Sequence, residues 1–384
     1  MGKYEEAKKQ FEKPLKVDKA YKDSYVNLAQ VNLIQGDLQE AIVQYTNAIN
    51  SGANDADIYF NIGRIYAELG DEEKTFRYIN KAININPLEG SYYVAKARQL
   101  VKKNKLKEAI EVMTELNRYC PDAFEAYHYS FLIYVQMGEY EKADQVLEIG
   151  LKEFPLDIGL YYDKLRLLNI VGEFDAALEL IGLLEKAPGF EDQERNIRVE
   201  EARIYLQTGK ADKAIELLEK AINMDGAENF EAHYLLMNSY LSMARFEDAT
   251  RIARIMIDAD DNSEYARSAY YYEAMCLMKC GKTNDAKARY QAAIKKYKVV
   301  SLKNPTMIDC YMFRALCHKD IEEYDKALET IDYLIKLKDD YAPAHLIKSG
   351  ILKDMGKEKE SQEEETRAKS LDTDLGQIIS NLQQ

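Results

Sequence analysis

The sequence is poor in the residues and motifs on which most catalytic sites depend. Of its 384 residues, four are histidine and none is tryptophan. It contains no Gly-x-Gly-x-x-Gly motif, no phosphate-binding loop and no His-Glu-x-x-His motif; these are the short patterns that would indicate nucleotide or metal chemistry. The four histidines are scattered along the chain. We therefore expect a protein that is not an enzyme and that needs no cofactor.

Cysteine is also scarce, and its number is odd. The five cysteines do not form the spaced even set that indicates a disulfide framework, which favours a reducing compartment, and we expect the cytoplasm. Cys276 and Cys280 precede a second group, Cys310, Cys317 and His318, so a zinc cluster is one interpretation. Burial of cysteine as a small apolar side chain is the favoured one, and we expect no metal site.

Basic residues are outnumbered, and long apolar runs are missing. Acidic residues number 66 and basic residues 52, which gives a net charge of -14. An acidic chain lacks the footprint that nucleic acids and anionic membranes require, so we expect neither as a partner. No apolar run approaches the ~20 residues of a membrane span. The chain also exceeds the ~250–300 residues of one compact core, which predicts several domains or a repeated structure.

A repeat dominates what the sequence does contain. The motif Gly-x-x-x-x-Ala recurs in variants such as GDLQEA, GEYEKA and GEFDAA. Its last residue falls at Ala7, Ala41, Thr75, Ala109, Ala143, Ala177, Ala214, Ala249, Ala286, Ala327 and Ser361. The residue numbers of the first six differ by a constant 34, and the later intervals range from 34 to 41. A fixed period of this length is the signature of a repeat architecture.

A period of about 34 residues with two helical segments resembles the tetratricopeptide repeat family. That family places a large aromatic residue at position 4 of each repeat, small residues at positions 8, 20 and 27, and proline near position 32. Position 4 is filled by Tyr25, Tyr59, Tyr93, Tyr127, Tyr161, Tyr270 and Tyr311. The resemblance implies an all-α protein, a right-handed α-solenoid of about ten helix-turn-helix repeats.

This register predicts three segments. Residues 1–20 form a half-repeat with only a second helix, residues 21–372 form the array, and residues 373–384 form a C-terminal capping helix with one apolar stripe. The half-repeat, MGKYEEAKKQFEKPL, is a natural cap or the cut edge of a longer protein. The second is favoured, because Pro14 removes a helical hydrogen bond and weakens this end as a regular interior helix.

Insertions interrupt the period. Extra residues near 187–196 and 258–263 are expected in loops between a second helix and the next first helix. The interval of 41 adds seven positions within AIKKYKVVSLKNP, about two helical turns. We expect the helix to extend as far as Pro305, and a projecting contact helix is the alternative.

In the family, the first helix of each repeat lines a concave groove through positions 2, 5, 6, 9, 12 and 13. The residues that this resemblance assigns to a peptide-binding groove are Phe60, Arg64, Arg98, Tyr162, Arg166, Arg203, Tyr234, Asn238, Tyr271, Tyr272 and Met275. Arginine binds carboxylates through two points, and aromatic residues with arginine provide much interface binding energy. The expected ligand is a protein segment with acidic and hydrophobic parts.

Alternatives accompany this groove. The arginines could pair with groove acids such as Asp163 and Glu200, and the tyrosines could pack between repeats. A carboxylate clamp of the chaperone-binding type is not expected, since no repeat combines lysine at position 5 with asparagine at position 9. The leading function is a non-enzymatic scaffold for protein interaction. The alternatives are the interaction arm of a larger co-chaperone or enzyme, and a regulator that senses small peptides.

Overall fold

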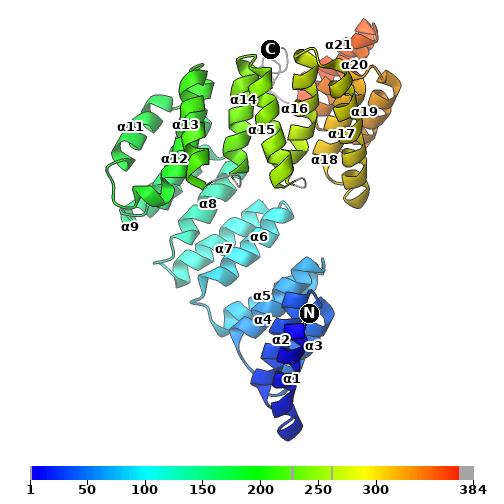
Figure 1. The fold of residues 1–384 in the computed structure, drawn as a ribbon. Coiled ribbons are helices and arrows are strands. Elements are labelled where there is room, and N and C mark those ends of the chain that lie inside the picture. The colour runs from blue at the N-terminus through cyan, green and yellow to red at the C-terminus, as the bar shows by residue number, and fades with distance from the viewer. Residues whose placement is uncertain (1, 226–228, 261–262, 372–384) are drawn as a thin grey trace. The chain divides into compact units, whose positions relative to one another are not determined.

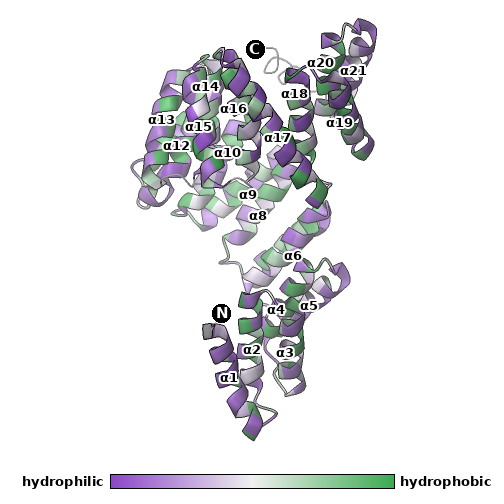
Figure 2. Ribbon diagram, turned by 45° about the vertical axis from the view of Figure 1, so that its right-hand side comes forward, coloured by the Kyte–Doolittle hydropathy of each residue, from purple (hydrophilic) through white to green (hydrophobic). Residues whose placement is uncertain are grey.

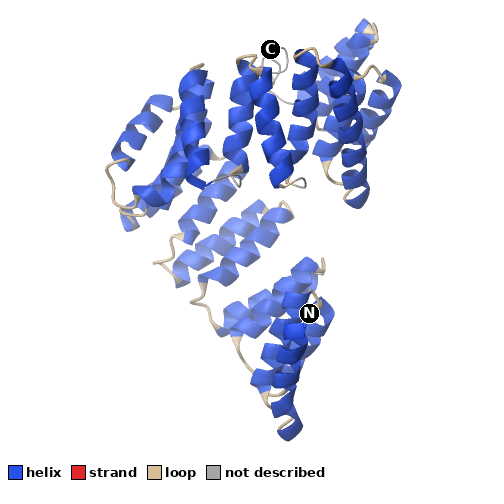
Figure 3. Ribbon diagram, in the orientation of Figure 1, coloured by secondary structure: helices blue, strands red, loops and turns tan. Residues whose placement is uncertain are grey.

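The computed structural model describes residues 2–225, 229–260 and 263–371, and these residues form helices with no strand among them (Figure 3). The all-α prediction is therefore confirmed. The predicted capping helix at 373–384 lies outside the described residues. None of the described helices is both long enough and apolar enough to cross a bilayer.

The chain divides into two compact units, Met1–Glu173 and Phe174–Gln384. The first unit contains α1 (Gly2–Val17), α2 (Lys22–Gln35), α3 (Leu38–Asn50), α4 (Ala56–Glu68), α5 (Glu72–Ile85), α6 (Gly90–Lys102), α7 (Leu106–Tyr119), α8 (Glu125–Gln136), α9 (Tyr140–Glu153) and α10 (Ile158–Val171) (Figure 1).

The second unit contains α11 (Phe174–Leu184), α12 (Phe190–Gln207), α13 (Ala211–Asp225), α14 (Phe230–Ser242), α15 (Phe246–Ala259), α16 (Glu264–Lys279), α17 (Thr283–Lys303), α18 (Ile308–Asp320), α19 (Tyr324–Leu337), α20 (Ala342–Asp354) and α21 (Glu358–Leu371). In both units each helix packs against the next along the chain, and several even-numbered helices also contact the next even-numbered helix. This is the stacking expected of a solenoid.

Amphipathic helices with small residues at their contacts produce this stacking. Figure 2 shows hydrophobic and hydrophilic residues on the same helices. The alanines of the repeated motif are 0% exposed from Ala41 to Ala327, because they lie where the two helices of a repeat meet. Ala7 on α1 is only partly buried, since among the described helices α1 packs chiefly against α2.

The turn between the two helices of a repeat keeps one backbone conformation even where glycine is missing. Gly36 ends α2 with φ of 80°, and its amide donates to the carbonyls of Asn32 and Leu33. In three other repeats the same position holds Asn104, Ala244 or Glu322, with φ between 56° and 65°. These side chains adopt the left-handed region at a cost of roughly 1–2 kcal/mol each. Tertiary packing therefore decides the turn, with glycine favouring it locally.

The insertion before Pro305 and the one at residues 187–196 behave differently. The prediction that the helix extends toward Pro305 is confirmed, because α17 continues to Lys303. Tyr297 on this extension is fully buried and donates a hydrogen bond of 2.5 Å to the carbonyl of Arg267. The loop predicted for residues 187–196 is wrong over most of its length, because α12 begins at Phe190. Phe190 is buried there, so the extra residues lengthen a first helix.

Candidate interaction site

A pocket of about 910 Å³ lies in the first unit along α4, α6 and α8 and the loops before α6 and α8. We call it the Arg98 pocket. Its lining residues are Phe60, Arg64, Leu88, Glu89, Gly90, Ser91, Val94, Ala95, Arg98, Gln99, Lys102, Cys120, Asp122, Ala123, Glu125 and Tyr129. Three of the predicted groove residues, Phe60, Arg64 and Arg98, are therefore brought together in one pocket.

Aromatic rings position the two arginines of this pocket. The guanidinium of Arg64 lies 5.9 Å from the ring centroid of Phe60. The guanidinium of Arg98 lies 5.1 Å from the ring centroid of Tyr129, and it also donates a hydrogen bond to the Tyr129 hydroxyl. Contacts between a cation and a ring face are attractive and leave guanidinium N–H groups available to a further acceptor. Both arginines are exposed, so a ligand can reach them.

The cations of the Arg98 pocket are not neutralised within the described part of the chain. Arg64, Arg98 and Lys102 form no ion pair with any described carboxylate, although the pocket also contains Glu89 and Glu125. An exposed guanidinium without a carboxylate partner is a ready donor for a two-point hydrogen bond to a carboxylate. The pocket therefore presents basic groups beside the apolar side chains of Phe60 and Val94.

The other two predicted arginines are neutralised. Arg166 Nη1 lies 3.7 Å from the Oδ1 atom of Asp163, which is buried. Arg203 Nη2 lies 2.6 Å from the Glu231 carboxylate, and Arg203 Nε lies 3.3 Å from Glu200. The alternative interpretation of arginines paired with groove acids thus holds for these two.

Position 6 of each repeat explains this difference. In α10 and α12 an acid stands three residues before the arginine, as in Asp163–Arg166 and Glu200–Arg203, and residues at this spacing share a helix face. In α6 the equivalent residue before Arg98 is Ala95. The signal that separates paired from unpaired arginines was present in the sequence.

Burial has the largest effect on the pKa of the Asp163 carboxyl group. Burial raises the pKa of Asp163 above its ordinary value, even though the His128 ring and Arg166 lower it. The second oxygen of Asp163 lies 2.5 Å from His128 Nδ1. Tyr162, also predicted to line the groove, has its ring centroid 5.8 Å from the Arg166 guanidinium. This group is a polar contact between α8 and α10, in which Asp163 Oδ1 lies at ion-pair distance from Arg166 and has no hydrogen bond among the described residues.

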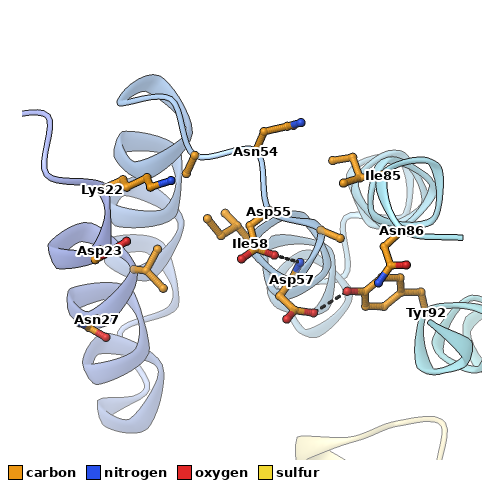
Figure 4. Close-up of a pocket in the computed structure, with 13 residues that line it drawn as sticks. Lys22, Asp23, Asn27, Asn54, Asp55, Asp57, Ile58, Ile85, Asn86 and Tyr92 are labelled. Carbon is orange, nitrogen blue, oxygen red and sulfur yellow. Dashed lines mark hydrogen bonds between the residues drawn. The ribbon is translucent and has the colours of Figure 1, made fainter. Parts of the chain in front are cut away.

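A second pocket, of about 780 Å³, lies at the beginnings of α2, α4 and α6 (Figure 4). Figure 4 shows Asp57 pointing toward Tyr92, whose hydroxyl donates a hydrogen bond of 2.5 Å to it. The Asp55 carboxylate accepts from the Asp57 amide at 3.0 Å, on the same helix start. Carboxylates are favoured at such helix N-termini by the macrodipole and by unpaired N–H groups. These acids are accounted for without a ligand.

Two predicted groove residues of the second unit, Tyr271 and Tyr272, take part in packing between helices. The Tyr271 hydroxyl donates a hydrogen bond of 3.1 Å to Asp320, and Tyr290 donates one of 2.8 Å to the same oxygen. The Tyr271 ring centroid lies 5.4 Å from that of Tyr272 and 5.8 Å from that of Phe313. Burial raises the pKa of Tyr271 well above its ordinary value, so its hydroxyl remains a donor.

The remaining predicted residues lie on α14 and α16 of the second unit. The Tyr234 ring centroid is 5.6 Å from that of Tyr265, and both Tyr234 and Met275 pack against the hydrophobic core that contains Tyr240. Asn238 is partly buried on α14. These residues lie apart from the Arg98 pocket along the chain, and their role in binding stays a prediction.

The cysteines have the character of core residues. Cys276, Cys310 and Cys317 are each 0% exposed. Burial raises the pKa of Cys276 and of Cys310 to about 12, which disfavours the thiolate needed to ligate a metal or attack a substrate. Within residues 2–225, 229–260 and 263–371, no group of three or more histidine, cysteine and acidic side chains is placed to hold a metal ion.

Sequence reasoning missed the loop residues of the Arg98 pocket. Leu88 and Glu89 follow Pro87, and Asp122 follows Pro121 at the equivalent place in the next repeat. Their recurrence after proline was the available signal. It was overlooked because groove positions were sought on the first helices alone.

Comparison with known proteins agrees with the repeat register. Four models described as the TPR repeat or tetratricopeptide repeat match residues 33–70, 56–87, 205–270 and 268–298. Over these residues the chain carries tetratricopeptide repeats. Matches fall in both halves of this repeat protein, as the recurring motif does.

Two curated relatives show how far the likeness extends. The BBSome complex member BBS4 of Bos taurus is 23% identical over 323 residues, covering 75% of this chain and 60% of the relative. The CTR9 homolog of Arabidopsis thaliana is 23% identical over 316 residues, covering 79% of this chain and 28% of the relative. This tetratricopeptide repeat chain thus spans less than two thirds of the length of either.

One solved structure of low identity shares the fold. The APC/C hetero-tetramer Cut9–Hcn1 gives a TM-score of 0.50 at 12% identity, covering 100% of this chain and 93% of the matched chain. A tetratricopeptide repeat protein from Parabacteroides merdae gives 0.45 at 20% identity, covering 62% and 93%. At such identities the likeness concerns the fold alone.

Proposed function

We propose that this tetratricopeptide repeat protein is a non-enzymatic scaffold whose Arg98 pocket binds a segment of a partner protein with acidic and hydrophobic side chains. The family's repeat fold is consistent with protein interaction, and the bovine relative is named as a member of a complex. Because a fold hosts unrelated functions, the proposal depends on the pocket.

The observation that carries the proposal is the set of unpaired cations. Arg64, Arg98 and Lys102 stand together without a described carboxylate partner in a chain of net charge -14. A protein with an acidic excess has ample carboxylates for pairing, as Arg166 and Arg203 illustrate. The lack of carboxylate partners therefore supports these exposed guanidinium groups as the contacts for a carboxylate of the partner protein.

The apolar part of the pocket supplies the second element of recognition. Phe60, Val94, Ala95 and Tyr129 lie among the cations and are only partly buried. When a ligand covers these rings and methyl groups, each Å² of apolar surface removed from water contributes roughly 25 cal/mol of favourable free energy. Neighbouring hydrophobic side chains would therefore add affinity, and the arginines would select for acidic ones.

The test begins with selection of short peptides on the full chain from a displayed random library. The selected peptide is then titrated by fluorescence anisotropy into the parent and into the Arg64→Glu, Arg98→Glu double variant. We expect acidic and aromatic residues among the selected peptides. We also expect at least tenfold weaker binding to the double variant, because two attractions become repulsions.

The Arg77→Glu, Arg118→Glu double variant is the matched control. Arg77 on α5 and Arg118 on α7 are exposed arginines of the same unit, and neither lines the Arg98 pocket. The control should bind like the parent, which excludes a general effect of net charge. Equal affinities of the parent and the double variant would contradict the proposal.

The second candidate function is that this chain forms part of a larger multidomain protein. The chain spans only 28% of the matched Arabidopsis relative and 60% of the bovine one. In that case the same pocket would serve as the interaction arm of a multidomain protein. The intact mass of the native protein distinguishes the two, since a scaffold alone has a mass near 44.2 kDa. A cytoplasmic location is part of the proposal and is supported by five cysteines without a disulfide.

Tyr234, Asn238, Tyr271, Tyr272 and Met275 constitute a second proposed contact surface, confined to the second unit. Their partial burial leaves some of each side chain open to a ligand. Tyr271 is the least accessible to this role, because its hydroxyl already donates to Asp320. Tyr272→Ala, measured with the same peptides, decides whether this surface contributes.

A further inference from the structure

The Arg98 pocket contains unpaired charge of both signs, and the two signs are separated along α6. Glu89 precedes the first turn of this helix, and Arg98 and Lys102 occupy its last turns. At 1.5 Å per residue, about 14 Å of helix axis separates Glu89 from Arg98 and about 20 Å separates it from Lys102. These distances are too long for the charges to neutralise one another.

The acidic side of the pocket has three members. Glu89, Asp122 and Glu125 lie at the beginnings of α6 and α8, and all three line the pocket. None forms an ion pair with a described basic residue, and the Glu89 side chain accepts a hydrogen bond from the Ser91 amide at 3.3 Å. The helix dipole explains why acids stand at these helix starts. It does not neutralise them.

The basic side lies at the other end of α6. Arg98 is fixed above the ring of Tyr129, and Lys102 stands one helical turn further along. Arg64 approaches from α4. Between the two charged ends lie the apolar side chains of Val94 and Ala95.

From this arrangement we infer that the pocket binds a segment whose basic and acidic side chains are separated along the segment. The bound segment places a basic side chain against Glu89, Asp122 and Glu125, and an acidic side chain against Arg64, Arg98 and Lys102. This inference rests on the proposed function and deepens it. It changes the expected partner from a generally acidic segment to one in which charges of both signs stand a set number of residues apart.

The structure also gives the spacing of those charges. An extended chain advances about 3.3–3.6 Å per residue. Crossing roughly 14–20 Å therefore takes about four to six residues between the basic and the acidic side chain. An aromatic or aliphatic side chain between them would lie against Val94 and Ala95.

Two synthetic peptides test the inference. One has the sequence Lys-Ala-Phe-Ala-Ala-Glu, in which the two charges are separated, and the other has the sequence Ala-Phe-Lys-Glu-Ala-Ala, in which they are adjacent; both have blocked ends and a fluorescent label. They have the same composition and net charge, so general electrostatic attraction treats them alike. We expect the parent chain to bind the first about five- to tenfold more tightly at low ionic strength, and salt to reduce this preference.

A charge exchange across the pocket sharpens the test. The Arg98→Glu, Glu125→Lys double variant keeps the net charge and reverses a charge at each end of the pocket. The acidic end then falls from three net negative charges to one, and the basic end from three net positive charges to one, so we expect the variant to lose most of the preference. The matched control is Arg118→Glu, Glu148→Lys, which makes the same exchange at exposed residues that do not line the pocket, and it should retain the preference of the parent.

The outcomes separate this inference from the function on which it rests. If the parent binds both peptides equally while the library-selected peptide still requires Arg64 and Arg98, recognition of the charge separation is overturned and the proposed function stands. If the exchanged variant keeps the full preference of the parent, recognition of the charge separation is also overturned. If no peptide depends on Arg64 and Arg98, both fail.

Discussion

Close contact between the two helices of a repeat at Gly63 gives a measurable consequence. A Cβ atom placed on Gly63 would lie 2.9 Å from Ile79 Cγ1, 3.2 Å from the Ile79 backbone nitrogen and 3.3 Å from the Thr75 carbonyl oxygen. Ile79 is only 1% exposed, so its side chain has little room to move. Gly63→Ala should therefore push α4 and α5 apart.

The magnitude follows from two opposing effects. Overpacking of a core costs about 1–3 kcal/mol, whereas alanine in place of glycine gains up to about 1 kcal/mol of helix propensity. We expect a net destabilisation of roughly 1–2 kcal/mol. Gly350→Ala is the control, because the only atom near its Cβ is Lys319 Cε at 3.8 Å, and it should stabilise α20 by about 0.5–1 kcal/mol.

Hydrogen exchange is the suitable assay, because long repeat arrays can lose two-state behaviour and a global midpoint would mix repeats. Slowly exchanging amides of α4 and α5 should open about five to thirty times more often in Gly63→Ala. Amides of α20 should open less often in Gly350→Ala. Unchanged or increased protection in α4 and α5 would refute the account of helix contact through small residues.

Two further predictions concern a strained turn and acid stability. Ala244→Gly should raise the protection of α14 and α15 by about 1 kcal/mol, because Ala244 adopts φ of 56° at a cost that glycine avoids; unchanged protection would contradict it. Burial raises the pKa of Glu364, but hydrogen bonds from His345 and Lys348 outweigh burial and hold that pKa below its ordinary value. A lowered carboxyl pKa stabilises the fold above about pH 4.5 and loses that contribution as the pH falls further. Glu364→Gln should therefore reduce the dependence of α20–α21 stability on acid, measured by hydrogen exchange between about pH 3 and 6, whereas Glu365→Gln should retain it.

The helices and their pairing could be predicted because the same residue types recur at the same positions in many repeats. Alanine at one position and tyrosine at another recur from repeat to repeat, and each small residue permits the close approach seen at Gly63 and Ile79. The longer α17 also followed from its insertion of two helical turns. The start of α12 did not, because the burial of Phe190 depends on neighbouring helices.

The candidate site was only partly predictable. Position 9 identified the arginines, but whether each is neutralised depends on position 6, where Asp163 precedes Arg166 and Ala95 precedes Arg98. That comparison could have been made from the sequence. The recurrence of loop residues such as Leu88 after proline was also visible in the sequence, but the conformation by which they enclose the pocket was not, because it is set by the surrounding packing.

Photo-crosslinking tests the central claim, that the Arg98 pocket binds the partner segment, most directly. Benzoylphenylalanine is introduced in place of Ser91, an exposed residue that lines the pocket on α6, or in place of Thr114, an exposed residue on α7 that does not. Each variant is irradiated with the library-selected peptide. The account predicts a crosslinked product from the Ser91 position, suppressed by the Arg64→Glu, Arg98→Glu substitutions, and little from the Thr114 position. Equal crosslinking from both positions, or a Ser91 product that survives loss of the arginines, would contradict it.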